Sequence, residues 1–385
     1  MFAEADKKFM KRALELAQRG KGFVSPNPLV GAVIVNNGRI VGEGFHANYG
    51  EDHAEVIALK EAGKEAEGAR LYVNLEPCSH HGKTPPCSLR VIEAGIKEVY
   101  IANKDPNPKV NGQGITLLRE RGIEVKTGLL AEEGERLNEA FFLAQREKRA
   151  FINLKAAQTL DGYLAAPGGD ARWITGEKAR KYGHKLRHEL DAVMIGIGTL
   201  LADNPRLTVR DFPIKANQPA RIILDSYLQF PLEARLLSED GGGDIYIFTG
   251  KNPRERKRAN SNDFSTADFK ARKARFKELD NVEIIETPMS AEGLLSPEKI
   301  VKKLAELGFI NILLEGGSRV NYSFQRAGLI NKYYFFLAPK LMTGNNGVPV
   351  FAGDAPKKIK ELPELNIVTQ KFLGEDLLLV AYPQD

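Results

Sequence analysis

A chain of 385 residues is too long for one typical hydrophobic core, so two domains are expected. Its composition, 43% hydrophobic and 27% charged, is ordinary for a globular protein, and no apolar run reaches the roughly 18 residues of a membrane-spanning helix. The net charge of +5 suits anionic small substrates and does not require nucleic acid as a partner.

The first 20 residues have the pattern of a charged amphipathic helix and lack the apolar stretch and cleavage site of a signal peptide. The only two cysteines, Cys78 and Cys87, are too few for a disulfide framework. These features predict a cytoplasmic protein, in which thiols stay reduced. A metal site is therefore favoured for the two thiols over a disulfide or an incidental buried pair.

Strands and helices alternate after that first helix. Such alternation is typical of an α/β layered sandwich with a partly parallel sheet, and it places loop residues at the carboxyl ends of strands. The order of the strands does not follow from the pattern. Strands are expected at 29–35, 39–45, 70–76, 98–103 and 123–128, and helices from His53, from Ser88, and over 114–122 and 129–149.

His53 and Glu55 lie in the first turn of a predicted helix, where such residues alone say little. Pro77-Cys78 and then Cys87 follow them, and the pattern His-x-Glu…Pro-Cys…Cys is that of the zinc deaminases. The usual gap between the two cysteines is two residues, whereas here it is eight.

Three ligands, His53, Cys78 and Cys87, leave the fourth tetrahedral position of one Zn²⁺ per chain open to water. Cys87 begins a predicted helix, which favours its thiolate. Zinc lowers the pKa of its water to about 7, and Glu55 is the expected catalytic residue that takes the proton and passes it to the ring nitrogen and leaving amine. The alternative is a closed structural site completed by a histidine of the same loop, which leaves Glu55 without a role.

The segments NPLVGAVIV, HAE and EPCSHHGKTPPC resemble the deaminase half of the bifunctional riboflavin biosynthesis deaminase/reductase family, which shows the same eight-residue gap. The resemblance implies a cytidine-deaminase-like three-layer sandwich. It implies as substrate 2,5-diamino-6-ribosylamino-4(3H)-pyrimidinone 5′-phosphate, which loses its 2-amino group. It also implies that the substrate is bound by Asn27, His46, Lys83, Asp105 and Asn107. For the two asparagines, ordinary turn chemistry is an equal alternative.

A second α/β pattern begins at an apolar strand, so we expect one domain over 1–149 and another over 150–385, without a flexible linker. The basic stretch 251–277 favours a solvated helix or insertion over a nucleic-acid contact. Strands are expected at 150–157, 191–198, 220–226, 244–250, 282–286, 309–317 and 332–339, and helices at 176–190 and 296–308.

A nucleotide site is suggested, weakly, where a buried strand ends at Glu315 and Gly316-Gly317 lead into a helix from Ser318. Glycines at a helix start let backbone N–H groups approach a phosphate. The pattern is not Gly-x-Gly-x-x-Gly, so it predicts a nucleotide only in part. Asp225, at another strand end, is of the kind that binds the ribose of NAD and argues against NADP.

WIT, GIGTLLADNPRLTVR and LLEGGSRVNYSF resemble the reductase half of the same family, whose fold is similar to dihydrofolate reductase. The resemblance implies reduction of the ribosyl chain to ribityl by NADPH. It implies cofactor contacts from Ala157, Trp173, Thr199, Asp203, Ser226, Gly317, Ser318, Arg319, Val320, Asn321, Tyr322 and Ser323. It implies substrate contacts from Ala171, Arg187, Leu207, Arg210 and Glu315.

Some of these positions have alternatives. Arg187 and Arg210 suit a phosphate, although Arg187 on a charged helix also fits an ion pair. Trp173 suits stacking on a cofactor or a place in the core. Ala171 stands where the family often has a serine, so a hydroxyl contact with substrate is in doubt there.

The sequence therefore predicts a two-domain enzyme that acts on a small phosphorylated pyrimidine, binds no nucleic acid or membrane, and forms a homo-oligomer, a dimer or a tetramer. Two alternatives stay open. One is a nucleic-acid-acting zinc deaminase with a C-terminal binding module, and the other is a non-catalytic regulator.

Overall fold

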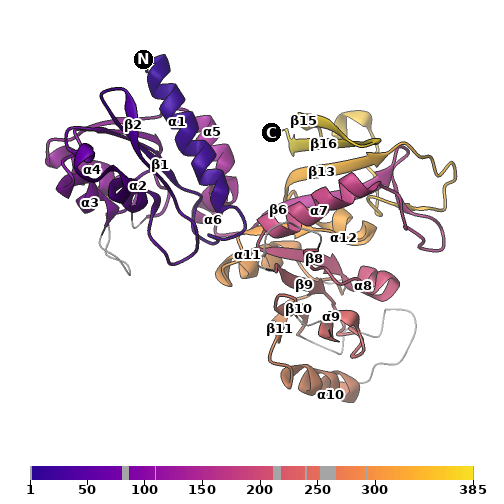
Figure 1. The fold of residues 1–385 in the computed structure, drawn as a ribbon. Coiled ribbons are helices and arrows are strands. Elements are labelled where there is room, and N and C mark those ends of the chain that lie inside the picture. The colour runs from indigo at the N-terminus through magenta and orange to yellow at the C-terminus, as the bar shows by residue number, and fades with distance from the viewer. Residues whose placement is uncertain are drawn as a thin grey trace. The chain divides into compact units, whose positions relative to one another are not determined.

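The protein was analysed as a computed structural model (Figure 1) that describes residues 2–79, 86–108, 110–210, 218–238, 241–251, 266–290 and 293–384. The chain divides into two compact units, Met1–Lys148 and Arg149–Asp385. Both units are mixed α/β, which confirms the predicted fold class. Among the described residues, no helix combines the length and apolar character needed to cross a membrane.

The first unit is built on a five-stranded sheet in the order β2-β1-β3-β4-β5. β1 pairs antiparallel with β2 and β3, whereas β3, β4 and β5 run parallel. The strands are β1 (Gly31–Asn36), β2 (Arg39–Phe45), β3 (Arg70–Leu75), β4 (Glu98–Asn103) and β5 (Glu124–Thr127). The helices are α1 (Glu4–Ala17), α2 (Ala54–Ala62), α3 (Cys87–Glu93), α4 (Gln113–Glu120), α5 (Ala131–Leu137) and α6 (Glu139–Glu147).

Two hydrophobic clusters form on the two faces of this sheet because successive strand residues point to opposite sides. Ala32 and Ile34 of β1 belong to the cluster that includes residues of α2, α3 and α4. Val33 and Val35 belong to the cluster that includes residues of α1. The unit is therefore a three-layer sandwich with the sheet in the middle.

One helix expected over 129–149 is wrong, because the chain forms two helices that part at Asn138. The Asn138 side chain accepts a hydrogen bond from the Leu29 N–H (2.8 Å) and donates one to the Leu29 carbonyl (2.9 Å). The buried amide thus satisfies a backbone segment 109 residues away. A contact so distant in sequence leaves no local sign in the helical pattern.

The second unit contains a nine-stranded sheet in the order β11-β10-β9-β8-β12-β6-β13-β16-β15. The strands from β11 to β13 are parallel, and β16 and β15 close one edge as antiparallel strands. Members of the sheet are β6 (Phe151–Thr159), β8 (Ala192–Gly196), β9 (Ala220–Leu224), β10 (Ile245–Gly250), β11 (Val282–Thr287), β12 (Asn311–Leu314), β13 (Ile330–Ala338), β15 (Leu365–Leu373) and β16 (Asp376–Pro383).

Helices and a small ribbon complete this unit, and hydrophobic clusters cover both faces of the large sheet. The sequence patterns did not identify the β15–β16 hairpin or the ribbon of β7 and β14. Of the basic stretch 251–277, the structure describes residue 251 and residues 266–277, and the latter form a helix. The remaining elements are α7 (Glu177–Glu189), α8 (Ile197–Asp203), α9 (Arg235–Ser238), α10 (Thr266–Lys277), α11 (Pro297–Glu306), α12 (Ser318–Arg326), β7 (Tyr163–Ala165) and β14 (Val348–Pro349).

Candidate functional sites

The start of α2 and the segment before α3 bring three metal-binding side chains together. The ligand atoms of His53, Cys78 and Cys87 all lie within 4.8 Å of one another. His53 is the N-cap residue of α2, and Cys87 is the first residue of α3. His53 Nδ1 lies 3.1 Å from Cys87 Sγ and 3.6 Å from Cys78 Sγ, so Nδ1 is the imidazole atom turned toward the thiols.

Both thiols are free, which sets aside the disulfide alternative. Hydrogen bonds from Cys87 and His53 hold the pKa of the Cys78 thiol well below its usual range, to about 4. The Cys87 backbone N–H also points at Cys78 Sγ, at 3.3 Å. The hydrogen bond with Cys78 and burial raise the pKa of the Cys87 thiol, so without a metal only one of the two sulfurs is a thiolate. Two cysteine sulfurs and an imidazole within one small volume are nevertheless a donor set that fits tetrahedral Zn²⁺, to which both cysteines would bind as thiolates.

Glu55 lies in the first turn of α2 and is 3% exposed. Burial raises its pKa to about 7, against the opposing charge of His53. Its buried Oε2 has no hydrogen-bond partner among the described residues. This buried carboxylate oxygen, two residues after the ligand His53, is free to bind a water molecule or a substrate amine, which fits a catalytic zinc.

Asn27 and His46 form a pair next to this cluster. Their Nδ2 and Nε2 atoms lie 3.1 Å apart, and His46 Nδ1 lies 3.2 Å from the Asp52 carbonyl. His46 Nδ1 must donate to that carbonyl, so its Nε2 accepts from Asn27 and the Asn27 amide oxygen stays available as an acceptor. The His46 ring also meets the His53 ring edge to face, with centroids 5.5 Å apart.

Asp105 and Asn107 follow β4, in the segment that leads to α4. Asp105 is buried, and its Oδ1 accepts a hydrogen bond from the Asn107 N–H at 2.8 Å. Glu76, which precedes Pro77-Cys78, connects this segment to the metal loop by accepting from the Asp105 N–H at 3.2 Å. Glu76 was not predicted as a site residue, although it is the first residue of the EPCSHHGKTPPC motif. Lys83, together with His80 and His81, lies outside the described residues.

In the second unit, Arg187 and Glu315 form a two-point ion pair, with Nε–Oε1 and Nη2–Oε2 distances of 2.8 Å. Burial alone would raise the pKa of Glu315, but the charges of Arg187 and Lys155 lower it to about 2. The Arg187 Nη1 donates to the Thr208 carbonyl at 3.2 Å. The ion-pair alternative therefore describes Arg187, although the pair is largely buried and not on the surface.

Lys155 of β6 is a third member of this charged cluster and was also missed. Its Nζ lies 3.8 Å from Glu315 Oε2, and its side chain is 22% exposed. A lysine inside an apolar strand was the available sign. Near the same helix α7, the Arg210 N–H lies 3.3 Å from His184 Nδ1, whereas the Leu207 side chain is buried in the core.

Residues expected at the cofactor gather in part around the start of α12. A side-chain carbon placed on Gly317 would lie 3.0 Å from Thr199 Oγ1, so α8 is adjacent to that helix start. Asn321, which is fully buried, donates to the Val350 carbonyl at 3.0 Å, and Ser318 donates to the Pro349 carbonyl. These two side chains hold α12 against residues 349–350. The first backbone N–H groups of a helix have no partner within it, so those of α12 can bind a ligand.

Other expected contacts lie elsewhere in the second unit. Trp173 is 64% exposed, which excludes the core alternative, and the Arg180 guanidinium stacks 4.5 Å from its ring centroid. Ala171 precedes it on the same loop. The Ser226 carbonyl accepts a hydrogen bond from the Gly250 N–H. The remaining residues expected at the cofactor lie on three elements: Ala157 on β6, Asp203 at the end of α8, and Arg319, which is exposed, with Val320, Tyr322 and Ser323 on α12.

Comparison with known proteins gives matches over nearly the whole chain. Residues 150–379 match the model of the RibD C-terminal domain, and residues 3–103 match the cytidine and deoxycytidylate deaminase zinc-binding region. The chain is 42% identical over 377 residues to riboflavin biosynthesis protein RibD of Bacillus amyloliquefaciens, covering 98% of this chain and 96% of that one. It is 35% identical to the Escherichia coli protein of the same name, covering 97% and 98%.

Two solved structures are similar throughout. One is Acinetobacter baumannii RibD, with a TM-score of 0.85, 32% identity and 99% of each chain covered. The other, from Thermotoga maritima, is called a diaminohydroxyphosphoribosylaminopyrimidine deaminase/5-amino-6-(5-phosphoribosylamino)uracil reductase, with a TM-score of 0.82, 36% identity and 99% of each chain covered.

Proposed function

The chain belongs to the RibD family of bifunctional riboflavin biosynthesis enzymes, and on that premise we propose how its residues divide the two reactions. The family confirms the resemblance predicted from the motifs, including a zinc-dependent deaminase and a reductase in one chain. The second half matches the RibD C-terminal domain, which argues against the alternative that this half is a nucleic-acid-binding module.

We infer that the substrate is 2,5-diamino-6-ribosylamino-4(3H)-pyrimidinone 5′-phosphate. The domain of residues 1–149 would remove its 2-amino group, and the domain of residues 150–385 would reduce the ribosyl chain to ribityl with NADPH. The observation that carries this proposal is that the first unit holds both the His53, Cys78 and Cys87 cluster and a buried Glu55 oxygen without a hydrogen-bond partner among the described residues. The printed name of the similar Thermotoga maritima protein supports the order of the two reactions.

Deamination would use Glu55 as the proton carrier. His53, Cys78 and Cys87 would hold the zinc, which would supply a Lewis acid to activate water for attack on the ring carbon. A carboxyl group whose pKa is near 7 can both accept and return a proton at neutral pH, which the two proton transfers require. The Asn27 amide oxygen, directed by His46, would accept a hydrogen bond from the substrate.

Reduction would take place near the charged cluster and the start of α12. NADPH supplies the hydride when bound. We propose that the first N–H groups of α12 meet a cofactor phosphate, that Trp173 stacks on the cofactor, and that Glu315 is held toward the substrate by Arg187. Arg210 is then the better candidate for the substrate phosphate, because the Arg187 guanidinium already binds Glu315 at two points.

We further propose a homo-oligomer, a dimer or a tetramer, located in the cytoplasm. The edge strand β15 supports self-association. Among the described strands it pairs with β16 alone, and it exposes apolar side chains, with Ile367 55% and Phe372 73% exposed. A long apolar edge strand is normally covered in a stable protein.

The test supplies the purified protein with the diaminopyrimidine phosphate, first alone and then with NADPH. Ammonia release is expected in both mixtures, and NADPH oxidation is expected only after deamination. NADPH oxidation without prior ammonia release would contradict the proposed order. Activity on a free or nucleic-acid cytosine base, with none on the diaminopyrimidine, would contradict the proposed substrate.

A further inference from the structure

The side chain of Glu76 occupies an unusual place between the end of β3 and the metal ligand Cys78. It is 4% exposed, and three backbone N–H groups point at its carboxylate. Oε2 accepts from Asp105 at 3.2 Å and from Gly112 at 2.9 Å, and Oε1 accepts from Ile115 at 3.2 Å. None of the ion pairs found among the described residues involves Glu76.

The three donors come from both ends of one segment. Asp105 begins the segment, whereas Gly112 and Ile115 belong to the cap and first turn of α4. One carboxylate therefore closes the loop that carries Asp105 and Asn107. It also lies at the N-terminus of α4, where a negative charge is favourable. The Glu76 backbone N–H donates to the Asn103 carbonyl at 3.0 Å, which fixes the same loop from its strand side.

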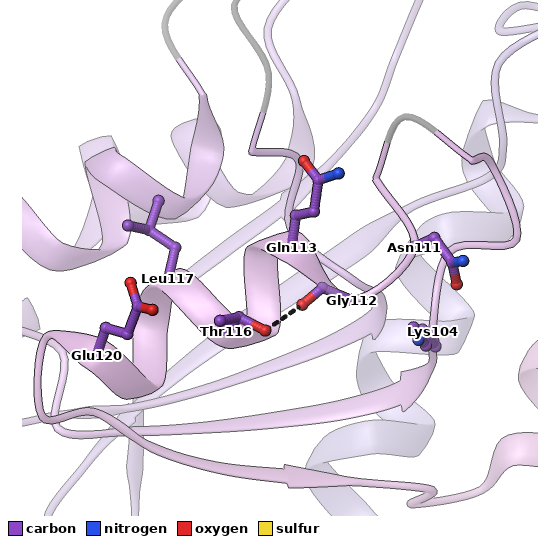
Figure 2. Close-up of a pocket in the computed structure, with 7 residues that line it drawn as sticks. All are labelled: Lys104, Asn111, Gly112, Gln113, Thr116, Leu117 and Glu120. Carbon is purple, nitrogen blue, oxygen red and sulfur yellow. Dashed lines mark hydrogen bonds between the residues drawn. The ribbon is translucent and has the colours of Figure 1, made fainter.

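The helix α4 packs closely on Glu76 and Pro77, directly before the metal ligand Cys78. A side-chain carbon on Gly114 would lie 2.1 Å from the Pro77 carbonyl oxygen and 3.2 Å from Glu76 Oε1. Gly114, Ile115 and Leu118 form the buried face of α4. Figure 2 shows the opposite, solvent side of the helix, with Thr116 bonded to the Gly112 carbonyl at 2.9 Å. The contacts of α4 with Glu76 and Pro77 thus belong to its buried face.

We propose that Glu76 is a positioning residue of the deaminase, which sets Asp105 and Asn107 in register with Cys78 and so tunes the fit of the pyrimidine substrate. This inference rests on the proposed deaminase function and on the substrate contact that the family resemblance implies for Asp105. A glutamine cannot replace the carboxylate, because it offers one acceptor oxygen and turns its NH₂ group toward a backbone N–H. At least one of the three donors then loses its partner, and the loop shifts.

Glu76→Gln is expected to raise the deaminase KM about tenfold or more, the change that losing a hydrogen bond to a charged group typically produces. The change in kcat should be several-fold smaller, zinc content should stay at one per chain, and reduction of the deaminated intermediate should be unaltered. Asp6→Asn is the matched control, because Asp6 is also a buried carboxylate of this unit, bonded by the Ala3 N–H and the Tyr72 hydroxyl. An equal KM increase in both variants means general loosening of the unit and overturns the proposal.

The single variant Asp105→Asn separates this inference from the proposed function. If Asp105→Asn leaves KM unchanged, the substrate role of Asp105 is wrong and the inference falls with it. If Asp105→Asn raises KM but Glu76→Gln does not, the inference alone is overturned. If Glu76 acts through Asp105, the double variant should show a fold-increase in KM well below the product of the two single fold-increases. A fold-increase equal to that product overturns the proposal.

A variant that does not fold needs a substitute. Glu76→Asp keeps both acceptor oxygens but places them one methylene farther from the three donors. If Glu76→Gln is recovered unfolded or without zinc, the same KM comparison is made with Glu76→Asp. A raised KM with retained zinc supports the proposal, and a wild-type KM overturns it.

Discussion

The guanidinium of Arg187 binds the carboxylate of Glu315 through two hydrogen bonds of 2.8 Å, although the two residues are 128 positions apart in the sequence. The pair joins α7 to the turn that follows β12, directly before the Gly316-Gly317 step. Lys155 of β6 adds a second positive charge at 3.8 Å. Three distant segments of the second unit therefore meet at one carboxylate.

Glu315→Gln should destabilise the protein at neutral pH by about 3–5 kcal/mol, because it leaves two buried cations without their partner. The Glu315 pKa of about 2 is below its ordinary value, so the pair stabilises the folded state above about pH 4.5 and loses that effect as pH falls toward 2. The stability difference between wild type and variant should shrink over that window, as measured by denaturant unfolding.

The control for this measurement is Glu177→Gln on the same helix. Glu177 pairs with Lys181 in an exposed i,i+4 arrangement, with both side chains more than half exposed. Its loss should have little effect on stability, because water and salt screen an exposed pair of charges. A similar cost for both variants would show that the Arg187–Glu315 pair behaves as a surface pair.

A preference for NADPH over NADH is expected despite Asp225. That carboxylate is fully buried and accepts hydrogen bonds from the Tyr227 N–H at 3.3 Å and the Phe230 N–H at 2.8 Å, so it stabilises a turn and does not face a ribose. Asp225→Asn should lower the melting temperature, at a cost of about 1–3 kcal/mol, and leave the ratio of kcat/KM for the two cofactors unchanged. Equal kcat/KM values in the wild-type enzyme would contradict the preference.

The parts of the fold that the sequence predicts are those with local patterns. The apolar run of β1 lies in adjacent residues, and His53, Glu55, Cys78 and Cys87 stand in short motifs that can be read directly. The helix break at Asn138 is not visible, because its cause is the backbone of Leu29. The same reason hid the Arg187–Glu315 partnership, in which neither side chain indicates the other.

Some misses had weaker causes. β15 escaped prediction because it is exposed on both faces and so lacks the alternation of a half-buried strand. Lys155 was not predicted as a site residue, because a single lysine does not interrupt the apolar pattern of its strand. Glu76 lies in the EPCSHHGKTPPC motif, which was interpreted through its cysteines. The role of Glu76 depends on backbone N–H groups 29 to 39 residues farther along the chain, which the motif does not indicate.

Zinc binding is expected to depend on both thiols. Cys78→Ser and Cys87→Ser should each be purified with almost no zinc, since a hydroxyl is a far poorer ligand than a thiolate. Ser88→Ala is the control, because the Ser88 hydroxyl donates to the Cys78 carbonyl at 3.0 Å without belonging to the ligand set. Metal analysis should find about one zinc per chain in that variant. Full zinc retention in both cysteine variants would remove the site.

Self-association should weaken when charge is placed on the exposed edge strand. Phe372→Glu is expected to lower the mass measured by sedimentation, because burying a carboxylate in an apolar contact is costly. Leu294→Glu, at a side chain 56% exposed outside β15, should leave the mass unchanged. A wild-type mass for Phe372→Glu, or a monomeric wild-type protein, would contradict association through β15.

Glu55→Gln should separate the two activities. Glutamine is nearly isosteric, so the fold and one zinc per chain should be retained, but it cannot accept a proton from water or deliver one to the leaving amine. Loss of general acid–base catalysis typically costs about 10² to 10⁴ in rate, and one residue here serves more than one transfer, so we expect the deamination rate to fall by about 10⁴-fold or more.

The readouts for Glu55→Gln are ammonia release from the diaminopyrimidine phosphate, NADPH oxidation with the already deaminated intermediate, and zinc content. Glu51→Gln is the control, since Glu51 is exposed in the loop before α2. Reduction should continue at close to the wild-type rate because its residues belong to the other unit. Near-normal deamination by Glu55→Gln would show that another group carries the proton. Loss of zinc would instead make Glu55 a support of the metal site, and loss of reduction as well would show that the two sites are coupled.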